Sequence, residues 1–179
     1  MDAACIRRMA AGEESGLAQL YDRHGRAVYG LACRILADPI EAEDVVQDVF
    51  AQAWRQSTRF DPSRASVTGW LFMIARTRAL DRLRSRRVRP AAAGVDGAHE
   101  PADDGPTPEA AALTEDQRAR VRQALDALDA PQRTAIEMAY YGGLTQADIA
   151  RELGEPLGTV KSRMRAALSR LRAALGPRS

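Results

Sequence analysis

Apolar residues recur every three to four positions over most of this chain, which is the period of amphipathic helices. The alternating pattern typical of strands is almost absent. Residues 17–35 predict one helix or a kinked pair, and further helices are predicted from position 38 and from about position 68. Four more helices are predicted between 115 and 175. We therefore expect an all-α protein.

The second predicted helix has a well-marked beginning. Asp38 is suited to the N-cap, Pro39 fits the first turn, and Glu41 stands where it would complete a capping box. The loop 57–66 follows, with turn-forming residues at 61–63. The third helix is expected over about 68–87.

Helical periodicity stops between residues 88 and 108, where proline and glycine recur without an apolar pattern. It resumes at Thr114, which with Gln117 fits a capping box. The four helices beyond are expected at about 115–128, 131–141, 145–153 and 157–175, with glycines 142, 143 and 154 in the turns. We expect two small helical bundles: a domain at 1–89, a flexible acidic linker at 90–112 and a domain at 113–179.

Charge follows the same division. Up to Pro90 there are 15 arginines against 11 acids, a net charge of +4, whereas 91–112 holds 5 acids and no base, a net of −5. From Leu113 onward, 11 bases against 8 acids give +3. Two mildly basic blocks therefore flank an acidic segment. This excess favours a nucleic-acid partner without deciding the question.

Few signs of metal, cofactor or catalytic chemistry are present. Cys5 and Cys33 belong to no CxxC or His/Cys cluster, so neither a disulfide nor a metal site is indicated. We expect Cys33 to be buried and Cys5 to be exposed near the N-terminus. Neither a phosphate-binding glycine loop nor a Ser/His/Asp set is visible, so no cofactor and no enzymatic activity are predicted. The longest apolar stretches fall short of the roughly 20 residues of a membrane span, and we expect a cytoplasmic protein.

Residues 145–175 carry the pattern of a helix-turn-helix. Ala150 is small where the two helices would cross, and Gly154 follows where the turn needs a positive φ. Val160 would hold the second helix on the first. Opposite its apolar face, the second helix carries small polar side chains flanked by bases. This suits a major groove, with base edges read at the centre and phosphates contacted at the sides, although a solvated helix face is the simpler alternative.

Seven arginines fall within fourteen residues, 76–89, of the third predicted helix. Such a run repels itself, which favours a position beside a polyanion. The preceding loop places Phe60 beside the turn at 61–64, and an aromatic ring with nearby polar groups can stack on an unpaired base. A core position for Phe60 is equally compatible with the pattern. Trp54 and Trp70 are expected in the core, because they lie on or near apolar stripes.

Three motifs occur in order along the chain: AEDVVQDVF at 42–50 with Trp54, FDP at 60–62 with WLFMIAR at 70–76 and ALDRL at 79–83, and LGTVKSR at 157–163. They resemble, in turn, the polymerase-docking helix, the promoter-melting segment and the recognition helix of sigma factors. Together with the acidic linker, their order and spacing resemble an extracytoplasmic-function (ECF) RNA polymerase sigma factor, a short member of the housekeeping-type sigma family. A stand-alone helix-turn-helix regulator is the alternative, which would leave the arginine run and the Phe60 loop unexplained.

The resemblance implies that the chain binds core RNA polymerase at the clamp helices and flap, and directs promoter recognition, DNA melting and transcription initiation. The residues implied in polymerase binding are Glu41, Asp44, Gln47, Asp48 and Gln52. Those implied in contacts with the minus-ten element, as duplex and as non-template single strand, are Phe60, Asp61, Ser63, Arg64, Arg76, Arg78 and Arg82. Those implied in contacts with the minus-thirty-five element are Thr159, Lys161, Ser162, Arg163, Arg165, Ala166 and Arg170. The linker corresponds to the segment that threads toward the active-site cleft and RNA exit path.

Two positions depart from the family pattern. Thr77 stands where the family usually has Asn, and Ala166 stands where relatives often have Arg or another large side chain. A methyl group can contact a thymine methyl but cannot hydrogen-bond guanine, so Ala166 predicts an A·T preference. The sequence ends four residues after the last predicted helix, so we expect no appended sensory domain. The resemblance then implies restraint in trans by an anti-sigma factor.

Overall fold

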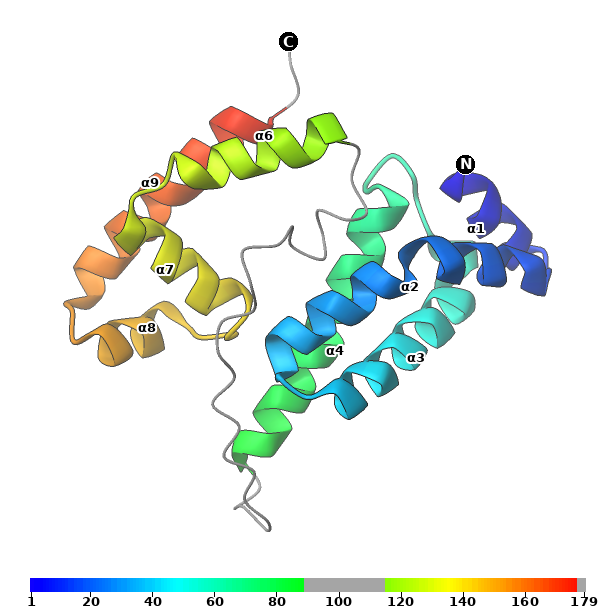
Figure 1. The fold of residues 1–179 in the computed structure, drawn as a ribbon, viewed down its shortest axis with the longest axis horizontal. Coiled ribbons are helices and arrows are strands. Elements are labelled where there is room, and N and C mark those ends of the chain that lie inside the picture. Colours follow the sequence, from blue (N-terminus) through cyan, green and yellow to red (C-terminus); the bar gives the residue numbers. More distant parts are fainter. Residues whose placement is uncertain (89–114, 177–179) are drawn as a thin grey trace. The chain divides into compact units, whose positions relative to one another are not determined.

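The computed structural model describes residues 1–88 and 115–176. The chain divides into two compact units, Met1–Ala112 and Leu113–Ser179. Throughout the described ranges the regular elements are helices and no strand occurs, so the predicted all-α class is confirmed (Figure 1). The predicted linker and the predicted Thr114 capping box lie outside the described residues. None of the described helices is long and apolar enough to cross a membrane.

The first unit contains α1 (Asp2–Ala10), α2 (Glu14–Leu36), α3 (Pro39–Gln56), the 3-10 helix η1 (Ser57–Arg59) and α4 (Val67–Val88). The stretch predicted as one helix or a kinked pair is therefore the single helix α2. The third predicted helix is found within a residue of its expected bounds.

The chain turns from α2 to α3 at Ala37, which takes the left-handed conformation with a φ of 52°. Asp38 then caps α3, since its Oδ1 accepts hydrogen bonds from the backbone N–H groups of Ile40 and Glu41, at 3.0 and 3.1 Å. The second half of the predicted capping box is replaced by another contact, because the Glu41 carboxylate accepts from Arg86 of α4. The predictions of Asp38 as the N-cap and of Pro39 in the first turn are therefore confirmed, whereas the predicted capping box does not form.

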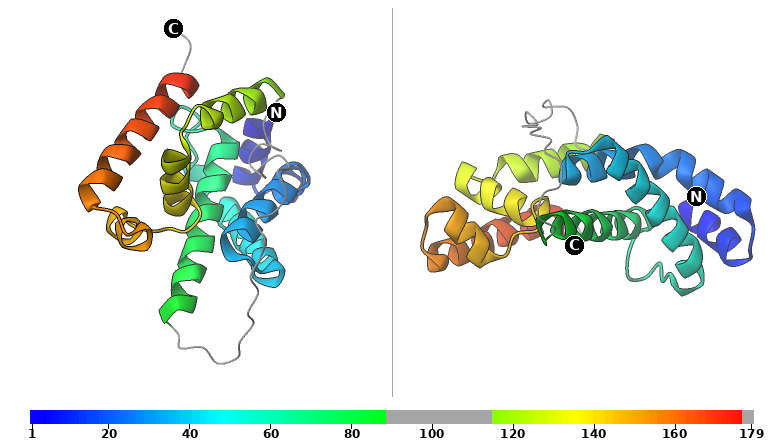
Figure 2. Two further views of the ribbon diagram at one scale, coloured as in Figure 1. Left: turned by 60° about the vertical axis from the view of Figure 1, so that its left-hand side comes forward. Right: turned by 90° about the horizontal axis from the view of Figure 1, so that it is seen from below.

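The core of the first unit lies between α2, α3 and α4, which run beside one another (Figure 2). Each of the three helices contributes residues with no accessible surface: Leu20, Val28, Leu31, Val45, Val49 and Leu71. Trp70 is also buried, as predicted, whereas Trp54 is half-buried. The apolar stripes read from the sequence are thus the faces that meet in this core.

Helix α1 is an addition that the sequence analysis did not predict. It packs on α2 and η1 and buries Cys5, Ile6 and Met9. The expectation of an exposed Cys5 is wrong, because this side chain keeps only 2% of its surface. Cys33, expected to be buried, is half-buried. The three apolar positions of α1 lie too close to the start of the chain to form a long periodic pattern, so only packing against α2 identifies them as core.

Polar contacts also fasten α1 to α2. Asp2 accepts hydrogen bonds from Arg23 at 2.7 Å and from Nε2 of the buried His24 at 2.9 Å. Burial alone would raise the pKa of Asp2, but these two hydrogen bonds outweigh it and lower the pKa below its usual value. The contacts close α1 over the end of the core.

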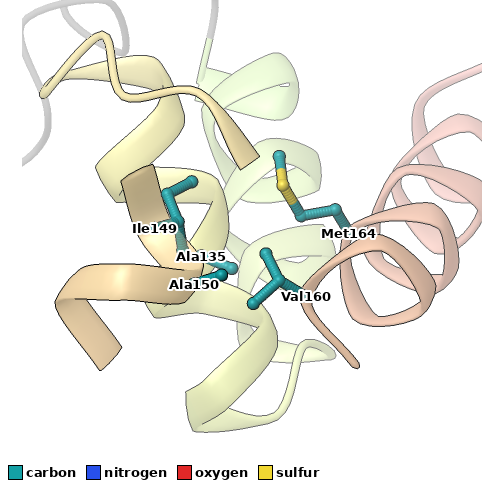
Figure 3. Packing of buried hydrophobic residues seen from close by; sticks show 5 residues of the cluster. All are labelled: Ala135, Ile149, Ala150, Val160 and Met164. Atoms are coloured by element: carbon teal, nitrogen blue, oxygen red, sulfur yellow. The ribbon is translucent and has the colours of Figure 1, made fainter. Parts of the chain in front are cut away.

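The second unit contains α6 (Glu115–Asp126), α7 (Ala130–Tyr140), α8 (Gln146–Leu153) and α9 (Leu157–Leu175). Helix α9 packs against the other three. Figure 3 shows side chains from α7, α8 and α9 converging on one small core, formed by Ala135, Ile149, Ala150, Val160 and Met164. The predicted roles of Ala150 at the crossing of α8 and α9 and of Val160 in joining them are consistent with this packing.

We expect Gly16→Ala to destabilise the first unit, because a Cβ at this position of α2 would lie 2.6 Å from the backbone oxygen of Cys5 in α1. Overpacking of this kind costs roughly 1–3 kcal/mol in the free energy of unfolding. Both tryptophans lie in the first unit, so urea unfolding followed by tryptophan fluorescence measures it selectively. Gly25→Ala is the matched control in α2, since the nearest atoms to its Cβ would be those of the Tyr21 ring, at an ordinary 3.5 Å. Equal unfolding midpoints for the two variants would contradict this close approach.

Candidate functional site

The acidic face of α3 and the arginine run of α4, predicted separately, meet along one side of the first unit. Arg82 bridges two carboxylates of α3: its two terminal nitrogens donate to Oδ2 of Asp44 and to Oδ2 of Asp48, each at 3.0 Å. Partial burial alone would lower the pKa of the Arg82 guanidinium, but the two carboxylates outweigh it and raise the pKa above its ordinary value.

Two further arginines repeat this arrangement one turn before and one turn after Arg82. Arg78 donates twice to Oε1 of Gln52, at 2.9 and 2.7 Å. Arg86 donates to Glu41 at 2.7 Å, to Asp38 at 2.6 Å and to the backbone oxygen of Leu36 at 3.1 Å. These three residues, spaced by four along α4, form a series of contacts that we call the arginine ladder: Arg78, Arg82 and Arg86.

The arginine ladder changes the interpretation of the arginine run. The sequence favoured a polyanion as its partner, whereas at these three positions the partners in the structure are polar and acidic groups of α3 and of residues 36–38 just before it. The four-residue spacing of the three arginines was the sequence signal that could have indicated this pairing. Every fourth residue of a helix lies on one face, and positions 41, 44, 48 and 52 of α3 are spaced similarly. Arg84 lies outside the ladder and pairs with Asp81 at 3.4 Å. The predicted DNA contacts of Arg76, Arg78 and Arg82 stay predictions.

Gln47, also predicted to bind polymerase, is exposed on α3 but does not join the ladder contacts. It lies at a groove of about 400 Å³ between α2 and α3, lined also by Tyr21, Gly25, Arg26, Tyr29, Glu43 and Val46. Of the five predicted polymerase-binding residues, four therefore accept hydrogen bonds from the arginine ladder, and Gln47 lies at this groove.

The loop between η1 and α4 has the predicted turn. Asp61 Oδ1 accepts from both the backbone N–H and the hydroxyl of Ser63, at 2.9 and 2.7 Å, and these bonds lower the pKa of its carboxyl. The half-buried ring of Phe60 packs on Trp70 with 5.0 Å between ring centroids. The sequence left open whether Phe60 lies in the core or is available to stack on a base. In the structure its ring packs on the core residue Trp70 and still keeps part of its surface accessible.

The turn between α8 and α9 is fixed at three points. Gly154 takes the predicted positive φ, at 63°, and the N–H of Glu155 donates to the backbone oxygen of Ala150 at 2.9 Å. Arg163 on α9 reaches back to the turn, with nitrogens 2.6 and 3.1 Å from the two carboxylate oxygens of Glu155. Thr145 and Asp148 form a capping box that begins α8.

The outer face of α9 matches the predicted pattern in part. The exposed residues along it include Thr159, Lys161, Ser162, Arg165 and Ala166. Two other predicted DNA contacts bind groups within the second unit: Arg163, which is half-buried, pairs with Glu155, and Arg170, which stays exposed, donates to Gln132 Oε1 at 3.0 Å. Arg170 thus contacts α7 and Arg163 contacts the turn between α8 and α9. The periodic pattern of the sequence did not indicate either contact.

Two family models match the chain, each within one structural unit. Sigma-70 region 2 matches residues 20–89, and Sigma-70 region 4 matches residues 118–171. The helical bundle bearing the arginine ladder and the helix-turn-helix therefore define a transcription initiation factor of the sigma-70 class.

Individual relatives narrow the class. The chain is 40% identical over 175 residues to the ECF RNA polymerase sigma factor SigK of Mycobacterium tuberculosis, covering 94% of this chain and 90% of that protein. SigK of Mycolicibacterium vanbaalenii is 40% identical over 179 residues, covering 97% and 88%. The crystal structure of Rhodobacter sphaeroides SigE in complex with the anti-sigma ChrR aligns with a TM-score of 0.51 and 35% identity over 96% of both chains. This chain belongs to the ECF RNA polymerase sigma factor family, as the motifs implied.

We expect Arg163→Gln to loosen the turn between α8 and α9, because it leaves the partly buried Glu155 carboxylate without its ion-pair partner. The loss should be about 1–3 kcal/mol of local stability. Hydrogen exchange measured by mass spectrometry would show faster exchange of the amides around residues 154–163. Arg165→Gln, on the exposed face of the same helix, is the control and should exchange like the wild type. Identical protection in both variants would mean that the ion pair does not stabilise the turn.

Proposed function

We propose that this sigma factor docks on the clamp helices of core RNA polymerase through the outer face of α3. The observation that carries the proposal is the exposure of two carboxylates one turn apart: the side chains of Asp44 and Asp48 keep 55% and 49% of their surface despite their ion pairs. Fixed acidic groups on a well-packed helix offer a complementary surface to a basic partner. Glu41, Gln47 and Gln52 extend this proposed docking face along the same helix.

The loop between η1 and α4 is the proposed site for the minus-ten element. Residues 61–66 are all exposed, and the hydrogen bonds from Ser63 to Asp61 hold the turn in one conformation. The ring of Phe60, supported by Trp70, would provide a surface on which an unpaired base stacks. Arg64 and Arg76 would contribute positive charge toward the DNA backbone.

Helix α9 is the proposed reader of the minus-thirty-five element. Its exposed Thr159, Ser162 and Ala166 would face base edges, while Lys161 and Arg165 would contact phosphates. The helix-turn-helix geometry supports this, since the turn and the small core fix α9 relative to α8. Contacts from Arg163 and Arg170 stay predictions, because each is engaged inside the unit.

Restraint in trans by an anti-sigma factor is the proposed mode of regulation. Its support is the R. sphaeroides relative, whose structure was solved in complex with an anti-sigma protein. The last turns of α9 also expose apolar side chains, with 39% of Leu168 and 40% of Leu175 accessible, a surface suited to a partner helix. The proposed place of action is the cytoplasm, where RNA polymerase supplies the chemistry that this chain directs.

The docking face is tested by the double variant Asp44→Asn/Asp48→Asn, which keeps the side-chain shape and removes both charges. We expect about a tenfold loss of affinity for core RNA polymerase, because charge-assisted hydrogen bonds are replaced by weaker neutral ones. Binding would be measured by fluorescence anisotropy of labelled full-length protein, with run-off transcription from the promoter of its own operon as the functional readout. Glu14→Gln, an exposed acid in the first turn of α2, is the control. Wild-type affinity and transcript levels in the double variant would contradict the proposed docking face.

Sequence selectivity by α9 is tested with a library randomised over the minus-thirty-five element. We expect an A·T preference at the step facing Ala166, and Ala166→Arg should shift it toward G·C because Arg binds the O6 and N7 atoms of guanine. A good contact of this type discriminates by about 1–3 kcal/mol. A strong G·C preference at that step in the wild-type protein would contradict the assignment.

A further inference from the structure

We propose that Arg82 is a positioning residue for polymerase docking: it holds the Asp44 and Asp48 carboxylates in the geometry that the clamp helices meet. This inference rests on the proposed docking face of α3. It assigns Arg82 a role within the protein, distinct from the DNA contact that the family resemblance implies.

The hydrogen-bond geometry supports a bridging role. One guanidinium nitrogen binds Asp44 and the other binds Asp48, and both bonds use the Oδ2 atom at 3.0 Å. These bonds involve only one oxygen of each carboxylate, and each carboxylate has a second oxygen that can accept from a partner. The guanidinium fork can bind two carboxylates at once, whereas the single nitrogen of a lysine cannot reproduce its planar geometry.

The charges along α3 explain why such a bridge is needed. Asp44 and Asp48 are four residues apart on one helix face, a spacing at which like charges repel. A cation between them offsets this repulsion and restricts the rotamers of both side chains. The partner then meets two ordered acceptors, which lowers the entropy lost on binding.

Neighbouring contacts hold Arg82 itself in place. The other members of the ladder, Arg78 and Arg86, bind α3 on either side of it. Beneath the ladder α4 buries Ala79 and Leu80, so the helix that carries Arg82 is anchored in the core. Its side chain is 31% exposed, and exposed ion pairs add little to folding stability. Variants at position 82 should therefore fold normally and differ in binding.

The experiment measures the affinity of full-length Arg82→Lys and Arg82→Gln for core RNA polymerase in the absence of DNA. We expect both variants to bind roughly fivefold to tenfold more weakly, the order expected for losing the pre-organisation of two side chains. Arg84→Lys and Arg84→Gln are matched controls on the same helix, where the arginine is 62% exposed outside the ladder, and should bind as the wild type does. Circular dichroism and urea unfolding confirm that all variants are folded.

The Lys variant separates positioning from a DNA contact. A contact with DNA phosphate needs a cation at position 82, so Arg82→Lys would then bind polymerase normally and lose little promoter opening. Positioning requires the fork, so Arg82→Lys would bind polymerase nearly as weakly as Arg82→Gln. Wild-type polymerase affinity in both variants would overturn the proposal.

A double-mutant cycle distinguishes failure of the positioning role of Arg82 from failure of the proposed docking face. Adding Arg82→Gln to Asp44→Asn/Asp48→Asn should cause no further loss of affinity, because Arg82 acts through those two carboxylates. An equal loss in both backgrounds would mean that Arg82 contacts polymerase directly, which overturns positioning and leaves the docking face standing. If the Asn variant alone binds like the wild type, both the docking face and the positioning role are wrong.

Discussion

The packing of α4 along α3 is the constraint on which the candidate surfaces of the first unit depend. Both helices bury small residues, with Ala42 and Ala53 on α3 and Ala75 and Ala79 on α4 fully inaccessible, and small side chains allow helix backbones to approach closely. At this approach the arginines of one helix reach the carboxylates of the other. The polar surface is thus set by the same geometry that forms the core.

This arrangement explains how a chain with a dense arginine run folds without a nucleic acid beside it. The ladder cations find partners on α3. Arg86 also joins α4 to the turn at residues 36–38, because it donates to the backbone oxygen of Leu36 and to Asp38. Positive charge that looks available in the sequence is therefore partly used inside the unit. The second unit does the same with Arg163, whose side chain keeps 18% of its surface, whereas Arg170 stays 53% exposed although it donates to Gln132.

The two units fix the helices that carry their candidate surfaces in different ways. In the first, a large apolar core and a ladder of ion pairs fix a helix face, and α1, which precedes the region matched by the family model, closes over its end. In the second, whose core is small, a left-handed glycine and one ion pair fix the turn between α8 and α9, and a capping box begins α8. Helix caps and turn conformations contribute more to holding the helices in place where less apolar surface is buried.

The sequence alone determined the helices from α2 onward and the resemblance to the family. Its 3.6-residue period, the cap at Asp38 and the glycine at position 154 are local signals, and each predicted the structure because neighbouring residues are sufficient to specify a helix or its end. Only the tertiary structure decided the burial of Cys5, the existence of α1 and the partners of Arg78, Arg82, Arg86 and Arg163. Those features join residues far apart in the chain, and an amphipathic pattern marks a polar face without saying whether solvent, DNA or another helix lies against it.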